Sequence, residues 1–144
     1  MIKEFVTAWD KHKDELREYI QTHDMGEYAD DYKDLVRILF EKVVNPEMED
    51  SWDHDEFNLD DLKVLDYGNY QGTQVFILHE DTYQPDIDDY VYTHVYYGSC
   101  SGCDTLLGIT RYDDILPNEQ QVEDLMTLCL HLLQRCRWMG EREE

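Results

Sequence analysis

The feature that most constrains the fold is a change in the spacing of apolar residues along the chain. At the beginning, residues 2–22 place apolar side chains three or four positions apart, and residues 28–43 repeat that spacing. This period is typical of an amphipathic helix with one face on a core. The sequence therefore predicts two helices, the first ending at Gly26 and the second ending at Pro46.

In the middle of the chain the period shortens to two. Residues 63–67, 73–79 and 90–97 are rich in β-branched and aromatic side chains. Such runs indicate strands, and the Gly and Asn residues within 68–72 favour a hairpin between the first two. The loop that follows, residues 80–88, is acidic.

Helical spacing returns after the third strand. Residues 104–115 favour a short helix, and Asn118 and Gln121 have the spacing of a capping box ahead of a long apolar stripe. The predicted order is helix–helix–strand–strand–strand–helix–helix. This order indicates an α+β fold, with a small antiparallel meander packed against helices, in a single domain over residues 1–144.

The charge limits the possible partners. The chain carries 34 acidic and 12 basic residues, a net charge of −22. Because proteins bind nucleic acid with Lys and Arg placed against phosphates, direct nucleic-acid binding is not expected.

The aromatic content of 12% indicates a folded protein rather than an acidic tail. No apolar run is long enough for a membrane span and no signal region opens the chain, so a cytoplasmic protein is expected.

Two acidic runs are the strongest candidates for a binding surface. The first, residues 47–61 (EMEDSWDHDEFNLDD), holds eight acidic residues and neither Lys nor Arg. The second is the loop 80–89, within a stretch, residues 67–99, that holds five acidic residues and no base. Ordered carboxylates can pair with Arg as phosphates do, and aromatic neighbours can add contact energy. The predicted partner-binding residues are Trp52, Asp53, Asp55, Glu56, Phe57, Asp60, Asp61, Asp86, Asp88 and Asp89.

These features favour an inhibitor that is not an enzyme. Its partner would be the basic surface of a nucleic-acid-binding complex, which the carboxylates would occupy by imitating nucleic acid. The chain has no Gly-rich phosphate loop, His-Glu-x-x-His or Gly-x-Ser-x-Gly motif. Asp53 and Asp55 begin like a calcium loop, but Asn58 stands where that loop requires Gly. An interaction or assembly protein without mimicry is an alternative.

A Cys-x-x-Cys motif supports a third class, a thiol-redox or zinc protein. Cys100 and Cys103 lie where a strand passes into a helix, a place that lowers a thiol pKa, although no further strands follow as a thioredoxin fold requires. Two cysteines supply half of a tetrahedral zinc site. No other cofactor is expected. A tight turn with two small thiols is a further reading. The remaining zinc ligands would come from His94, Cys129, His131 or Cys136, of which the two cysteines fit the core better.

The run around this motif resembles a signature of small acidic bacteriophage proteins. It reads Tyr-Tyr-Gly-Ser-Cys-Ser-Gly-Cys-Asp-Thr-Leu over residues 96–106 and covers about a tenth of the chain. In charge and size the chain also resembles phage inhibitors of restriction and CRISPR systems. The resemblance implies a host-defence protein as the target and the host cytoplasm as the location.

Overall fold

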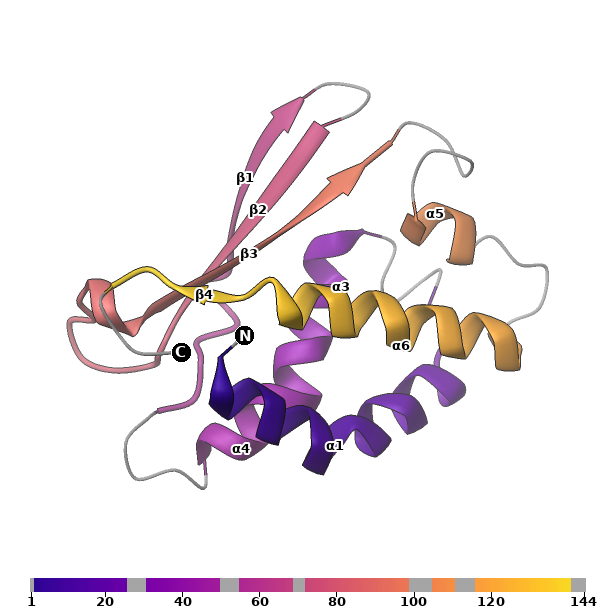
Figure 1. Cartoon of the computed structure of the whole chain (residues 1–144), viewed down its shortest axis with the longest axis horizontal. Helices are drawn as coiled ribbons and strands as arrows, with labels where there is room; N and C mark the ends of the chain where they lie inside the picture. The colour runs from indigo at the N-terminus through magenta and orange to yellow at the C-terminus, as the bar shows by residue number, and fades with distance from the viewer. Residues whose placement is uncertain are drawn as a thin grey trace.

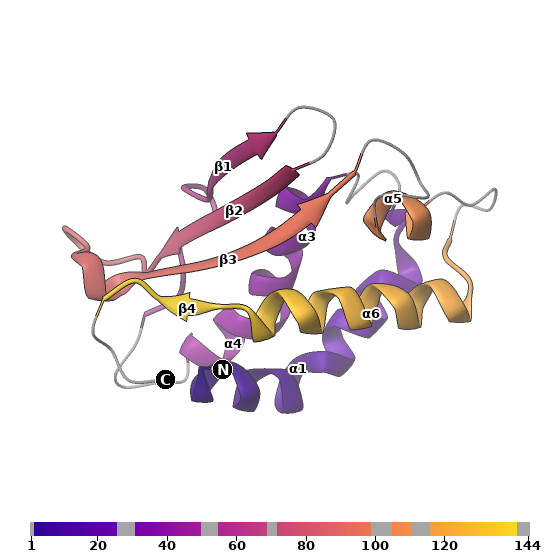
Figure 2. The same cartoon turned by 45° about the horizontal axis from the view of Figure 1, so that its top comes forward.

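Helices from both ends of the chain lie on one face of a central antiparallel sheet (Figures 1 and 2). The computed structural model describes residues 2–25, 31–49, 55–68, 72–98, 105–110 and 116–140. The predicted α+β class with an antiparallel meander is confirmed.

The N-terminal helix follows the predicted stripe. Helix α1 (Lys3–Thr22) buries Phe5, Leu16 and Ile20 and exposes its charged positions. It ends at Thr22, four residues before Gly26. The next described helix, α3 (Tyr32–Leu39), begins where the Asp31 carboxylate accepts the backbone N–H of Asp34 at 2.9 Å. That bond satisfies a donor that the first helical turn leaves unpaired.

The prediction that Pro46 ends the second helix is wrong. A π-helical turn, η1 (Phe40–Val44), continues α3, and Pro46 is the second residue of α4 (Asn45–Glu49). In an α-helix a proline ring clashes with the carbonyl four residues earlier. Here the N–H of Asn45 bonds the carbonyl of Phe40, five residues back, so the wider turn accommodates the ring.

The sheet has the strand order β1-β2-β3-β4, antiparallel throughout. Its strands are β1 (Lys63–Gly68), β2 (Gly72–His79), β3 (Tyr90–Tyr97) and β4 (Arg137–Trp138). The first three match the predicted runs. The fourth, two residues long, was not predicted, because a pair of residues has no period to detect.

Two described helices follow β3 in the chain, the second packed against that strand and the first packed on the second. They are α5 (Thr105–Thr110) and α6 (Glu119–Gln134). The predicted capping box is confirmed, since Asn118 and Gln121 each accept the other's backbone N–H. The Thr93 hydroxyl donates to the Leu132 carbonyl at 2.6 Å and ties β3 to α6 in the core.

Four aromatic rings connect distant segments in that core. Phe5 of α1 meets Phe40 edge-on at 5.8 Å between centroids, and Phe40 meets Phe57 edge-on at 5.3 Å. Phe57 stacks on Trp138 of β4 at 6.0 Å. The cluster therefore joins the N-terminal helix, the π turn, the acidic segment before β1 and the last strand.

Candidate functional site

The two acidic runs predicted from the sequence come together at one end of the sheet. The N–H of Asn58 bonds the carbonyl of His79 at 2.8 Å, and the N–H of Asp81 bonds the carbonyl of Glu56 at 2.7 Å. Phe57 and Glu80 form an isolated antiparallel bridge between these bonds. Residues 55–61 and 80–89, called the acidic end below, thus form one continuous surface.

Buried side chains fix the first segment of the acidic end. Asn45 exchanges two hydrogen bonds with the backbone of Phe57: its amide donates to the carbonyl at 3.1 Å and its oxygen accepts the N–H at 2.9 Å. The Glu80 carboxylate, 2% exposed, accepts the N–H of Asp55 at 2.8 Å. Buried side chains therefore hold the backbone of Asp55 and Phe57, on either side of the exposed Glu56.

Phe57 differs from its predicted role in partner contact. Its side chain is 2% exposed and packs in the aromatic cluster. The alternation that exposes Glu56 turns Phe57 toward the core, so this ring anchors the acidic end and is not available to a partner. Exposed apolar contacts come instead from Tyr83 and Ile87, which are 90% and 64% exposed.

Asp61 is also partly committed to the fold. Its carboxylate bonds Nε2 of the buried His79 at 2.8 Å and lies 3.1 Å from Nζ of Lys63. The hydrogen bond from His79, followed by that from Lys63, lowers the pKa of Asp61 below its usual value. Neutralising Asp61 would remove these bonds, so its role is structural as well as electrostatic.

The second segment contains a short 3-10 turn, η2 (Ile87–Asp89), closed by its own carboxylates. Asp86 accepts the N–H of Asp88 at 2.9 Å, and Asp89 accepts the N–H of Asp86 at 3.0 Å. The turn lies at the end of the sheet away from α5 (Figures 1 and 2). Reciprocal capping orients this backbone as the hydrogen bonds of Asn45 orient the first segment.

The structure places eight of the predicted partner-binding residues. The exposed ones are Asp55, Glu56, Asp60, Asp86 and Asp88, the half-buried ones are Asp61 and Asp89, and the buried one is Phe57. Trp52 and Asp53 lie outside the described residues, as do Cys100 and Cys103 of the proposed metal site.

The candidate partners of a zinc ion divide into two pairs. Cys129 and Cys136 are buried in the core, as predicted, and burial raises the pKa of each thiol to about 12. Burial therefore disfavours the thiolate form that a metal ligand must have. His94 and His131 instead line one surface cavity. Across the described ranges, no group of three metal-ligating side chains occurs.

That cavity holds a basic cluster that the sequence reasoning missed. It measures about 410 Å³ and is lined by Tyr92, His94, His131, Gln134, Arg135 and Arg137. The signal in the sequence is weak, because Arg135 and Arg137 belong to different elements and His94 comes from β3, some forty residues earlier. The pairing of Tyr92 with Arg137 across β3 and β4 brings these residues together.

The arrangement as a whole offers two kinds of chemistry. The acidic end can pair with cations of a protein surface, and the basic cluster can accept an anion. Within the part of the chain that the structure describes, no helix has the length and apolar character needed to cross a membrane. Comparison with family models, with curated proteins and with solved structures finds no match for this chain.

Proposed function

We propose that the protein binds the basic surface of a nucleic-acid-binding protein through its acidic end and thereby excludes nucleic acid from that surface. The supporting observation is the joining of two acidic runs, residues 55–61 and 80–89, into one hydrogen-bonded surface. Neither run contains Lys or Arg. Following the resemblance to phage inhibitors, we further propose a host-defence protein as the target.

The rigidity of the acidic end favours this function. A flexible acidic chain loses conformational freedom when it binds, and that loss weakens affinity. At the acidic end, Asn45 and Glu80 already hold the backbone of residues 55–57. Carboxylates on a backbone that is already held can pair with the Arg and Lys residues of a protein groove that binds nucleic acid. They lose less conformational entropy on binding than the carboxylates of a flexible chain would.

Apolar side chains beside the carboxylates can supply binding energy that ion pairs alone do not. Rim ion pairs contribute little individually, and most binding energy comes from a few buried anchors. Tyr83 and Ile87 project from the acidic end and can be covered by a partner. The charges would then determine the association rate and the choice of partner, while these two side chains would increase the affinity.

A matched pair of triple variants tests the proposal. The first, Asp55→Asn with Glu56→Gln and Asp60→Asn, neutralises exposed carboxylates of the acidic end and leaves the bonded Asp61 in place. The control, Asp10→Asn with Asp14→Asn and Glu18→Gln, removes the same charge from exposed positions of α1. Proteins captured from a bacterial lysate at low salt should be retained by the control and lost by the first variant.

Nucleic acid supplies the second arm of the experiment. Duplex DNA added to the captured complex should displace the partner, because the DNA phosphates and the carboxylates of the acidic end would compete for the same Lys and Arg residues of that partner. The protein alone should show no DNA or RNA binding by fluorescence anisotropy at physiological ionic strength. Equal loss of the partner by both triple variants would show that only net charge matters. A partner that DNA does not displace would favour interaction without mimicry.

A further inference from the structure

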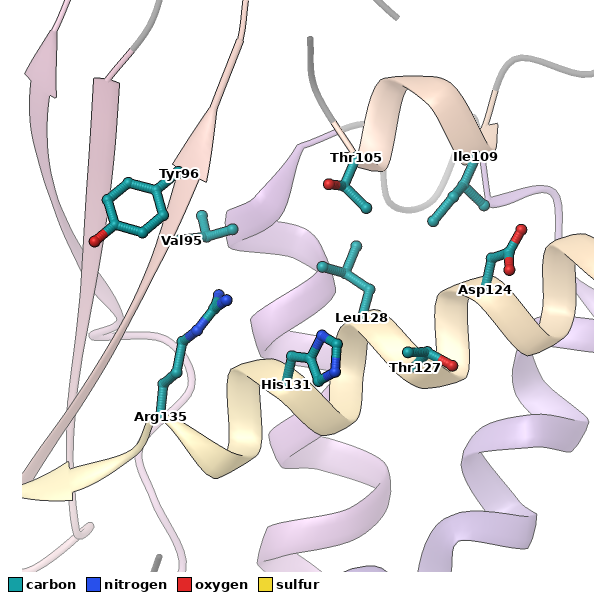
Figure 3. A pocket seen from close by; sticks show the side chains of 9 residues that line it. All are labelled: Val95, Tyr96, Thr105, Ile109, Asp124, Thr127, Leu128, His131 and Arg135. Carbon is teal, nitrogen blue, oxygen red and sulfur yellow. The ribbon is translucent and has the colours of Figure 1, made fainter. Parts of the chain in front are cut away.

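Two adjoining cavities share the side chains of His131 and Arg135: the first is lined from β3, the C-terminal end of α6 and β4, and the second from β3, α5 and α6. One is the basic cavity described above. The other, of about 480 Å³, has an apolar wall formed by Val95, Ile109 and Leu128 (Figure 3). Both volumes fall within the range of about 300–1,000 Å³ that is usual for small-molecule sites.

Helix α6 builds the floor shared by the two cavities. Leu128, His131 and Arg135 follow one another at spacings of three and four, so they form one stripe along the helix. The neighbouring Leu132 and Cys136 are buried. The stripe therefore runs from an apolar side chain to a guanidinium, a sequence of groups suited to a ligand with two unlike ends.

Arg135 differs from two other arginines of the described residues, Arg17 and Arg37. Arg17 pairs with Glu123, and Arg37 lies 3.9 Å from the carboxylate of Asp34. For Arg135 the described residues provide no carboxylate within ion-pair distance; its guanidinium donates to the His94 carbonyl at 3.4 Å. Figure 3 shows the side chain directed toward β3, between Tyr96 and Leu128. A guanidinium has five donors, and one backbone bond leaves most of them to face the cavity.

The groups around His94 are cationic or neutral. Arg135 and Arg137 line the basic cavity with His131, and the remaining lining side chains are Tyr92 and Gln134. Burial, followed by the charge of Arg135, lowers the pKa of His94. The carboxylate that lines the neighbouring cavity is Asp124, eleven residues from Arg135 and therefore about 16 Å away along the helix. An anion at Arg135 would meet the charges of Arg135 and Arg137 and no carboxylate among the described residues that line the basic cavity.

We propose that the joined cavities bind a small oxyanion carrying an apolar group, with the oxyanion at Arg135 and the apolar group against Val95, Ile109 and Leu128. Phosphate and carboxylate share this chemistry. A polymeric anion is disfavoured by the net charge of −22. A ligand with one or two charges is repelled less, because fields from the remote carboxylates fall off over a screening length of about 8 Å at physiological ionic strength.

Simple probes test the proposal on the full chain. Phenyl phosphate and benzoate represent the two oxyanions, while inorganic phosphate and phenol each supply one half of the ligand. Titrations followed by NMR should show both aromatic anions shifting signals of His94, His131 and the Leu128 methyls. Each should bind at least tenfold more tightly than either half ligand. The affinity of benzoate, which stays ionised over this range, should also rise from pH 7.5 to pH 6, because an anion in the cavity favours protonated His94.

Substitutions then test whether Arg135 holds the oxyanion. Arg135→Gln should weaken phenyl phosphate at least tenfold, and Arg135→Lys should weaken it less, because a bidentate contact becomes a single charge. Arg37→Gln, which removes an arginine outside both cavities, should have no effect. Circular dichroism identifies any variant that fails to fold, and the NMR titration of the unaltered protein decides the question in that case.

Three results would overturn the proposal: phenol binding as tightly as phenyl phosphate, affinity unchanged in Arg135→Gln, or no signal shifts in the cavities with any anion. A short peptide containing Glu and Leu that binds tighter than every small anion would assign the cavities to a protein partner instead. The site is independent of the acidic end, so Arg135→Gln should still capture the partner proposed above.

Discussion

The acidic end and the basic cavity lie at different points along β3 and represent opposite uses of charge. The acidic end includes the residues that directly precede Tyr90, where β3 begins, and hydrogen bonds from Asn45 and Glu80 hold part of its backbone. In the basic cavity two arginines, Arg135 and Arg137, lie with His131 around His94, four residues further along the strand. The comparison shows that a surface with many charged residues is not for that reason a specific binding site.

The acidic end illustrates abundance. With 34 acidic residues in 144, carboxylates will gather somewhere on any surface. The informative feature is therefore the set of buried groups that holds them, namely Phe57, Asn45 and Glu80. The basic cavity illustrates rarity, because 12 basic residues seldom meet by chance in such a chain. A cluster containing two of them, beside two histidines, is more specific than any acidic run.

The largest expected effect comes from the anchor of the acidic end. Phe57→Ala should lower the free energy of unfolding by about 3–5 kcal/mol, since it opens a cavity among Phe5, Phe40 and Trp138. Urea denaturation followed by circular dichroism measures it. Tyr83→Ala, at a side chain that is 90% exposed, should change stability by no more than about 0.5 kcal/mol. Similar losses in both variants would show that the acidic end is not anchored through Phe57.

The regular elements could be predicted because their signals are local. The stripe of α1 and the capping box of Asn118 depend on residues within a few positions of each other. The π turn before Pro46 and the two-residue strand β4 could not be predicted, because both depend on tertiary packing. Phe57 was misread for the same reason: between acidic neighbours it has the pattern of an exposed contact, and only the fold turns it inward.

Candidate sites divide in the same way. The acidic runs were visible in the sequence, but their joining depends on backbone bonds between residues 56–58 and 79–81. The basic cavity had only a weak signal. Arg135 and Arg137 are two positions apart, but His94 lies 41 positions before Arg135 and meets it through the packing of α6 on β3. His94 and His131 were considered only as possible zinc ligands, and the arginines that line the same cavity were not considered.

A smaller, pH-dependent effect separates Asp61 from the other carboxylates of the acidic end. Its pKa is lowered in the folded protein, so its bonds to His79 and Lys63 stabilise the fold above the unfolded value of about 3.8. That stabilisation is lost as the pH falls through the lower folded value. Asp61→Asn should therefore lower the urea midpoint at pH 7 and leave it nearly unchanged at pH 2. Asp60→Asn, at the exposed neighbour, should leave both midpoints nearly unchanged. Equal effects of the two variants would make Asp61 an ordinary surface charge.

The smallest expected effect concerns His94 and tests whether Arg135 governs the basic cavity. Because the folded pKa of His94 lies below its usual value of about 6.5, the folded protein binds fewer protons than the unfolded chain just below that pH. Stability should then fall slightly as the pH drops from 6.5 through the folded pKa, and level off below it. His94→Gln should remove this step from the pH dependence of the urea midpoint.

NMR titration of the His94 ring separates the two causes of that shift. Arg135→Gln should raise the pKa of His94 part of the way toward 6.5, because the charge of Arg135 is the second cause and burial, the first, remains. Arg137 lines the same cavity, and Arg137→Gln should change the pKa of His94 less. An equal rise in both variants would mean that His94 responds to the summed charge of the cavity. The basic cavity would then resemble the acidic end, with many charges acting together, and the contrast between the two regions would disappear.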